Sequence, residues 1–246
     1  PEIIGLILTY LTVIVIINSF NLIDGVDGLA AGLGIFTTLT FGMYFYVAAH
    51  AEYAALAFAM CGSLLAFLIF NRSPARIFMG DTGSLLIGLI NAILVVQFIN
   101  IAGSPGALVP FPASPAIAIA ILIIPLFDTL RVFSIRIFNR RSPFSPDRNH
   151  IHHILLDRGM SHKAVSFVLI VVNIFFVAVA YLLSFVSINI LIPVLITLAF
   201  GGFTLVYLRK PRLMVVATAD NEDILQLTKP SRILPLTPAK KAAEHN

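Results

Sequence analysis

Cysteine and charged residues are scarce in this chain of 246 residues. Cys61 is its one cysteine and lies within an apolar run, so neither an intrachain disulfide nor a thiolate metal site is expected. Only 11% of the residues are charged while 59% are hydrophobic, a composition too apolar for a soluble domain of this length. The sequence therefore predicts an integral membrane protein with several spanning segments.

The apolar runs are long enough for seven membrane spans, since a spanning helix needs about 20 residues. We expect these spans at about 3–20, 29–49, 54–70, 84–101, 115–138, 164–186 and 189–208. Pro125 is expected to kink its helix, because proline removes a backbone donor. The predicted fold is an all-α, polytopic membrane helical bundle. We expect residues 1–208 to form the transmembrane domain and residues 209–246 a polar cytoplasmic tail.

The basic residues are sorted by side when the loops are assigned alternately to the two faces of the membrane. All 16 lysines and arginines fall on one side, in or near loops 71–83 and 139–163 and in the tail, and the opposite loops contain none. This asymmetry predicts that the basic side is cytoplasmic. Topology and contact with the anionic lipid bilayer explain the excess of positive charge, so no nucleic-acid partner is expected.

Carboxylates collect at the predicted cytoplasmic boundary. NLIDGVDGLAAG, residues 21–32, carries Asp24 and Asp27 between glycines, and IFMGDTGSLLIG, residues 77–88, carries Asp81 before an apolar helix. Taken alone, Asp81 would fit a helix N-cap, and the glycines would fit close helix packing. Three carboxylates reaching one boundary from different helices, however, suit Mg²⁺ held together with substrate phosphates.

A basic loop follows in RSPFSPDRNHIHHILLDRG, residues 141–159. Its histidines alone would fit a transition-metal site, but the neighbouring arginines favour a receptor for phosphate oxygens. Carboxylates that hold Mg²⁺, opposite a basic loop that holds phosphates, are the components of a phosphoryl-transfer site. Upstream of the loop, Asp128 is expected either to pair with Arg131 at i+3 and orient the loop or to contact substrate.

Three motifs in order, NLIDGVDGLAAG, FNRSPARIFMGDTGS and SPFSPDRNHIHHILLDRG, resemble the polyprenyl-phosphate N-acetylhexosamine-1-phosphate transferases of bacteria, glycosyl transferase family 4. The resemblance implies an all-helical enzyme of ten or eleven spans in the bacterial cytoplasmic membrane, with its active site facing the cytoplasm. It also implies transfer of a sugar-1-phosphate from a UDP-N-acetylhexosamine to undecaprenyl phosphate, with release of UMP and with Mg²⁺, or Mn²⁺, as cofactor.

The histidine loop points to one branch of that family. HIHHILL resembles the branch that uses UDP-GlcNAc to begin O-antigen, common-antigen or teichoic-acid linkage units, so GlcNAc-1-phosphate is the expected group transferred. The phospho-N-acetylmuramoyl-pentapeptide transferases of peptidoglycan synthesis, which carry three consecutive histidines, are the alternative. The resemblance leaves the exact hexosamine and the oligomeric state, monomer or homodimer, open.

The resemblance also assigns roles to individual residues. The implied catalytic residues are Asp24, Asp27, Asp81, His150, His152 and His153. The implied substrate-binding residues are Gly25, Val26, Asn71, Phe78 and Arg148. Asp27 and Asp81 are the implied metal ligands, and Asp24 supports them.

One family motif has no counterpart. The family carries an aspartate-rich DDxxD on a helix upstream of NLIDG, and no pair of adjacent aspartates occurs here. Together with the start at Pro1 and the seven spans, this leads us to expect that the family's N-terminal third is missing. The alternatives outside the family are a membrane transporter, an intramembrane aspartyl protease and a non-catalytic membrane protein. A transporter would need polar residues through the middle of its spans, where this chain is almost purely apolar.

Overall fold

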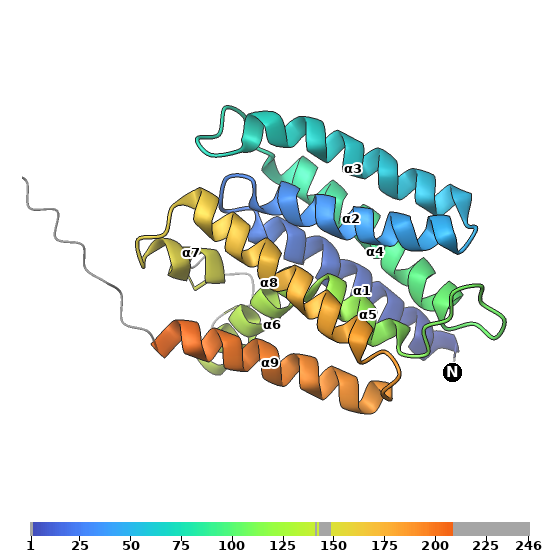
Figure 1. The fold of residues 1–246 in the computed structure, drawn as a ribbon. Helices are drawn as coiled ribbons and strands as arrows, with labels where there is room; N and C mark the ends of the chain where they lie inside the picture. Colours follow the sequence, from blue (N-terminus) through green and yellow to red (C-terminus); the bar gives the residue numbers. More distant parts are fainter. Residues whose placement is uncertain (1, 141, 143–148, 209–246) are drawn as a thin grey trace, which may run out of the picture. The chain divides into compact units, whose positions relative to one another are not determined.

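The computed structural model describes residues 2–140, 142 and 149–208, and these residues contain helices and no strands (Figure 1). In chain order the helices are α1 (Glu2–Ile23), α2 (Leu29–Val47), α3 (Ala51–Asn71), α4 (Gly80–Ala102), α5 (Ser114–Ile121), α6 (Ile123–Phe138), α7 (Ile151–Leu156), α8 (His162–Leu182) and α9 (Ile188–Leu208). The predicted all-α fold is thus confirmed for this part of the chain. Arg148 and the predicted tail, 209–246, lie outside the described residues.

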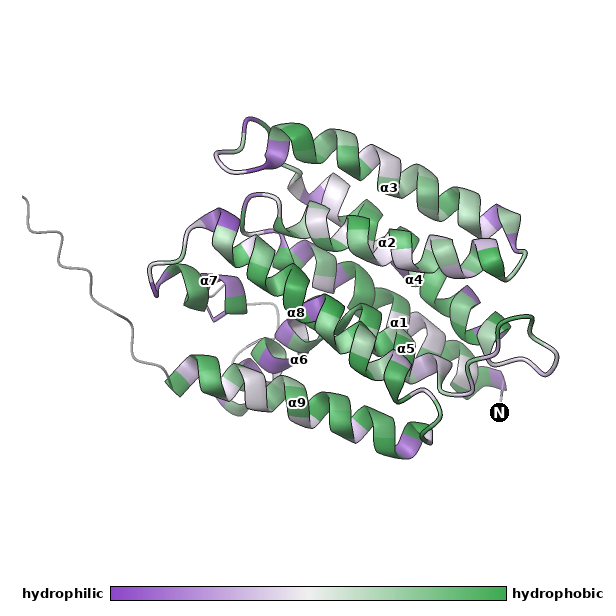
Figure 2. Ribbon diagram, in the orientation of Figure 1, coloured by the Kyte–Doolittle hydropathy of each residue, from purple (hydrophilic) through white to green (hydrophobic). Residues whose placement is uncertain are grey.

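Six helices, α1 to α4 with α8 and α9, are long and apolar enough to cross a membrane. Figure 2 shows apolar residues along their lengths, with hydrophilic residues at α7 and in the loop between α3 and α4. Helix is the expected state for such segments, because a bilayer offers no partner for a free backbone donor or acceptor. The predicted multi-pass bundle is confirmed.

The expected span at 115–138 consists of two helices, α5 and α6, that meet at an angle of 82° and together are long and apolar enough for one broken span. The break lies at Leu122, three residues before the proline that was expected to kink this segment. Pro125 cannot donate to the carbonyl of Ile121, its normal helical partner. Asn173 of α8 replaces that bond: its Nδ2 donates to Ile121 O at 2.9 Å, and its Oδ1 accepts from Ile124 N at 3.3 Å.

Close approach of helices depends on small residues on α2 and α4. A Cβ at Gly88 of α4 would lie 2.6 Å from the backbone Cα of Ile17 in α1, so only glycine allows these helices to touch. Gly32 of α2 faces Ile170 of α8 in a similar way, with its Cβ position 2.5 Å from that residue's Cδ1. Packing therefore explains Gly32, the last glycine of the first acidic motif.

The ends of α1 and α3 and the starts of α2, α4 and α8 lie at the same end of the bundle, which we call the site end (Figure 1). The acidic motifs and the histidine segment are all at this end. The opposite end carries Glu52, which lies 3.5 Å from His50.

We predict that Asn173→Ala destabilises the bundle by about 2 kcal/mol, because it leaves two buried backbone groups at the bend without partners. Unfolding in mixed detergent micelles measures the loss. Val171→Ala on the same helix, at a position 45% exposed, is the control and should change stability by less than about 0.5 kcal/mol. Equal stability of the two variants would show that Asn173 does not hold the bend.

Candidate active site

A cavity of about 380 Å³ lies at the site end, between the end of α1, the start of α2 and the segment that leads into α4. Seven residues singled out from the sequence line it together: Asp24, Gly25, Val26, Asp27, Asn71, Phe78 and Asp81. Asn21 and His162, which the sequence interpretation did not single out, line it as well. The structure therefore brings both acidic motifs to one cavity, although they are far apart in the sequence.

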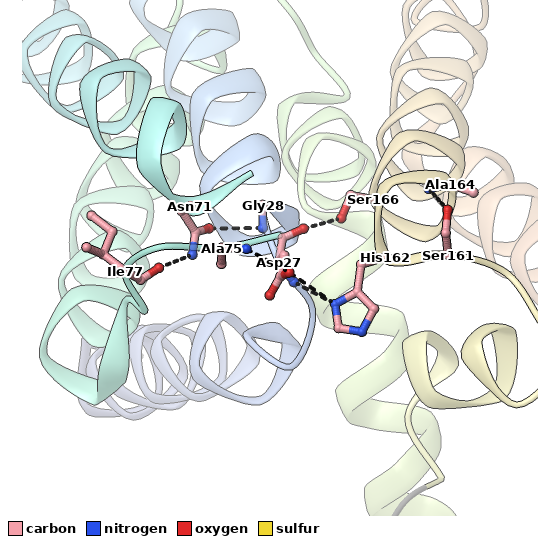
Figure 3. A network of polar contacts seen from close by, with 9 residues as sticks. All are labelled: Asp27, Gly28, Asn71, Ala75, Ile77, Ser161, His162, Ala164 and Ser166. Carbon is pink, nitrogen blue, oxygen red and sulfur yellow. Dashed lines mark hydrogen bonds and ion pairs between the residues drawn. The ribbon is translucent and has the colours of Figure 1, made fainter. Parts of the chain in front are cut away.

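Asp27 is held from several directions (Figure 3). Its carboxylate Oδ2 accepts from the backbone N–H of Ala75 at 3.2 Å and lies 3.5 Å from Nδ1 of His162. Its backbone carbonyl accepts from the Ser166 hydroxyl at 2.9 Å. His162 and Ser166 belong to α8, so Asp27 connects the loop after α1 to a helix that begins more than a hundred residues later.

Asn71 fixes the turn between α1 and α2. Its Oδ1 accepts from Gly28 N at 2.9 Å, and its Nδ2 donates to Ile77 O at 2.9 Å (Figure 3). Gly28 has φ of 76°, a left-handed conformation that glycine adopts without steric cost. The family resemblance places Asn71 in the uridine pocket, and the structure shows its amide also tying two loops of the cavity together.

Asp81 lies in the first turn of α4, one residue after Gly80. The N-cap position is Met79, so the alternative that Asp81 is simply an N-cap is wrong. Asn21 of α1 donates through Nδ2 to Asp81 Oδ1 at 3.1 Å and to the Ser84 hydroxyl at 3.0 Å. Asn21 therefore holds the second acidic motif against α1.

The carboxylates of the cavity influence one another. Burial, and then the negative charge of Asp81, raise the pKa of Asp24 from 3.8 to about 6. Two carboxylates that repel in this way favour a cation between them. No group of three His, Cys, Asp or Glu side chains is arranged to hold a metal within the described ranges. The donors present fit Mg²⁺ bound through one or two carboxylates, with its other ligands from phosphate or water.

Asp128 of α6 anchors the histidine segment. Its Oδ2 lies 2.8 Å from Nδ1 of His150, and its Oδ1 accepts from Ile151 N at 2.9 Å. Arg131 donates to Asp128 Oδ1 at 2.8 Å, the i+3 ion pair expected from the sequence, and also to Asn149 O. Because Asp128 is 1% exposed and these partners surround it, its direct role is to position the start of α7.

His152 brings α7 against the first acidic motif. A Cβ on Gly25 would lie 2.3 Å from Nε2 of His152, so the absence of a side chain at Gly25 permits the contact. The ring of His152 stacks parallel to that of His150, with centroids 5.6 Å apart, and lies 4.3 Å from that of His153. The three histidines thus form a cluster beside the acidic cavity and do not line it.

His152 is neutral in this arrangement. It is 1% exposed, and burial followed by the neighbouring His153 lowers its pKa from 6.5 to about 3. An uncharged imidazole donates or accepts a hydrogen bond but does not offset phosphate charge. Its Nδ1 is buried and has no hydrogen-bond partner among the described residues. Arg148, the cation expected beside these histidines, lies outside the described residues.

We predict a pH-dependent effect of Asp24→Asn in the absence of divalent cations. Because the folded-state pKa of Asp24 is raised, the parent's stability falls as pH rises from about 4 to about 6 and stays lower above that range. The variant lacks this loss, so its melting temperature should exceed the parent's at pH 7 and match it near pH 4. Glu52→Gln, at the opposite end, is the control, and a difference that does not change with pH would contradict the assignment.

Comparisons with known proteins agree with the motifs. Residues 1–99 match the model of glycosyl transferase family 4. The chain is 38% identical over 169 residues to a probable undecaprenyl-phosphate N-acetylglucosaminyl 1-phosphate transferase of Bacillus subtilis, covering 69% of this chain and 45% of that protein. It is 36% identical over 170 residues to undecaprenyl-phosphate alpha-N-acetylglucosaminyl 1-phosphate transferase of Escherichia coli K12, with 68% and 44% covered.

A third relative has a different polyprenyl carrier in its name. The chain is 37% identical over 177 residues to decaprenyl-phosphate N-acetylglucosaminephosphotransferase of Mycobacterium tuberculosis H37Rv, covering 65% of this chain and 43% of that protein. The chain therefore spans less than half the length of these curated relatives. Residues 1–99, which carry both acidic motifs, match glycosyl transferase family 4, and the chain is similar to these N-acetylglucosaminyl 1-phosphate transferases.

Proposed function

We propose that this chain, as part of its complete polypeptide, transfers GlcNAc-1-phosphate from UDP-GlcNAc to undecaprenyl phosphate, which yields undecaprenyl-diphosphate-GlcNAc and UMP. The observation that carries the proposal is the meeting of Asp24, Asp27 and Asp81 in one cavity, with His152 against Gly25 beside it. The names of the relatives support the choice of sugar and lipid. We place the reaction at the cytoplasmic face of a bacterial inner membrane, where it begins a cell-surface polysaccharide.

Asp27 and Asp81 are the proposed metal ligands, with Asp24 as the neighbouring carboxylate that completes the negative site. Mg²⁺, or Mn²⁺, bound here supplies charge neutralisation for the diphosphate and for the departing UMP. Ala75 and Asn21 each donate one hydrogen bond to these ligands, to Asp27 and Asp81 respectively, and so fix their orientation. Loss of such an outer contact typically lowers metal affinity or activity by about 10- to 100-fold.

The nucleotide end of the donor is proposed to enter over Phe78, which lines the cavity and is 80% exposed. An exposed aromatic ring at the rim of a cavity offers a stacking surface for a base. At the other end, His152 is neutral and suited to donate a hydrogen bond to a phosphoryl or sugar oxygen. The charged contacts to phosphate are then left to Arg148 and the metal.

An oxygen of the lipid phosphate attacks the β-phosphorus of UDP-GlcNAc, the bond from that phosphorus to the bridging oxygen breaks, and UMP leaves. A lipid phosphate is already anionic at neutral pH, so the direct reaction does not depend on a strong general base. A double displacement, in which an aspartate is the nucleophile, is the alternative route. Of the three aspartates that line the cavity, Asp27 has the most firmly held carboxylate, since it accepts from Ala75 N and lies beside His162.

We predict that Asp27→Asn and Asp81→Asn, each in the complete polypeptide, reduce UMP release from UDP-GlcNAc by at least about 100-fold. The assay contains undecaprenyl phosphate and Mg²⁺, and omission of either should abolish the signal. Glu52→Gln, at the opposite end of the bundle, serves as the matched control. Near-normal turnover in both variants would refute the metal role, and preference for a UDP-muramoyl-pentapeptide would refute the choice of sugar.

We predict that Asp128→Asn lowers kcat by roughly 100-fold, because an amide cannot accept from all three partners and the histidine segment shifts. The KM for UDP-GlcNAc should change far less, since Asp128 does not line the nucleotide cavity. Ser134→Ala, an exposed change on the same helix, is the control. If kcat falls only in proportion to the loss of folded protein, Asp128 has a purely structural role.

A further inference from the structure

A second cavity at the site end, of about 690 Å³, shares no lining residue with the acidic cavity. Three of its lining residues are cations, Arg72 and Arg76 from the segment after α3 and Lys163 from the first turn of α8. The lining also includes Ile69, Phe70 and Ser73. The lining contains no carboxylate, so the cavity is a concentrated positive site.

The positive charges in this cavity have no acidic partner. The ion pairs within the described part of the chain involve His50, Asp128 and Asp27 with their neighbours, and none includes these three cations. Their side chains are exposed, and the Ser73 hydroxyl offers a further donor beside them. Like charges gathered in one hollow repel, and a bound anion relieves that repulsion.

The position of the cavity decides which kind of anion fits. Ile69 and Phe70 form one wall in the last turn of α3, where they are 65% and 48% exposed. Both α3 and α8 are candidate spans, so in a bilayer the exposed side chains of Ile69 and Phe70 would meet lipid and the cations would lie at its boundary. An apolar wall under a cluster of cations matches a lipid whose phosphate is anionic and whose chains lie in the membrane. A free phosphate would make no use of Ile69 and Phe70.

We propose that this cavity binds the headgroup phosphate of an anionic phospholipid, with Arg72, Arg76 and Lys163 as its ligands. The two segments that carry these cations also contact Asp27. Ala75, one residue before Arg76, donates its N–H to Asp27 Oδ2 at 3.2 Å, and His162, one residue before Lys163, lies 3.5 Å from the same oxygen (Figure 3). A bound lipid therefore holds both partners of that carboxylate in place.

The test measures lipid retention and not turnover, so it succeeds or fails separately from the proposed function. The complete chain is purified in detergent with phosphatidylglycerol and phosphatidylcholine, and the retained lipids are counted by native mass spectrometry. Arg72→Gln, Arg76→Gln and Lys163→Gln should each reduce phosphatidylglycerol retention about fivefold, the equivalent of about 1 kcal/mol per cation near a membrane surface. Retention of phosphatidylcholine should not change.

Arg140→Gln is the matched control, because it removes the same charge from an exposed arginine that does not line the cavity. It should retain phosphatidylglycerol as the parent does, and so should Asp81→Asn. An equal loss in Arg140→Gln and the three cavity variants would overturn the proposal in favour of unspecific attraction. Undiminished retention in a variant that combines Arg72→Gln, Arg76→Gln and Lys163→Gln, with its unfolding temperature unchanged, would overturn it as well.

Competition separates the sources of phosphate. Millimolar inorganic phosphate or UMP should leave the lipid bound, and displacement by either would show that the cavity takes a soluble anion. Undecaprenyl phosphate added in equal amount should displace phosphatidylglycerol no better than phosphatidic acid does. Selective displacement by undecaprenyl phosphate would assign the cavity to the acceptor lipid and refute the phospholipid assignment.

Discussion

The contact between Gly25 and His152 joins the two halves of the candidate site. One half comes from the end of α1 and the loop after it, and the other from α7, far along the chain. The contact is possible because glycine leaves room for an imidazole where a Cβ would lie 2.3 Å from Nε2. It also needs α7 to be held in place, and Asp128 does this through His150 and Ile151. A glycine and a buried carboxylate therefore determine where the histidines stand relative to the aspartates.

In the absence of ligands, the acidic cavity carries an excess of negative charge. The carboxylates of the acidic cavity are held mainly by neutral donors, the backbone of Ala75 and the amide of Asn21, and these orient an anion without neutralising it. The pKa of Asp24 is raised first by burial and then by the negative charge of Asp81, which is part of that excess. Burial also favours the neutral form of His152. The positive charge that offsets these carboxylates is therefore expected from a bound metal ion or from Arg148. This excess of negative charge is consistent with the proposed site, in which a metal ion and a diphosphate would bind together.

Much of this architecture could be predicted from the sequence, for physical reasons that differ by feature. The spans were predictable because a bilayer forces apolar segments into helices. The grouping of Asp24, Asp27 and Asp81 was predictable, because a carboxylate is energetically costly near a membrane and therefore indicates a functional site when it occurs in an apolar chain. The kink before Pro125 was predictable from the proline, but its sharpness was not, since the broken turn is held by Asn173, a partner on another helix. Asn21 and His162 were missed because a single asparagine or histidine has no pattern of its own.

The order in which the site residues appear along the chain has a consequence for biosynthesis. Asp27 is made early, whereas Ser166 and His162, which contact it, follow only after α7. A chain is synthesised from its N-terminus, so α1 and α2 exist before the helix that completes this carboxylate's surroundings. Until α8 is made, Asp27 lacks both of its partners on that helix. The surroundings of Asp27 are therefore complete only after the segment that follows the histidines has been synthesised and α8 packs against α2.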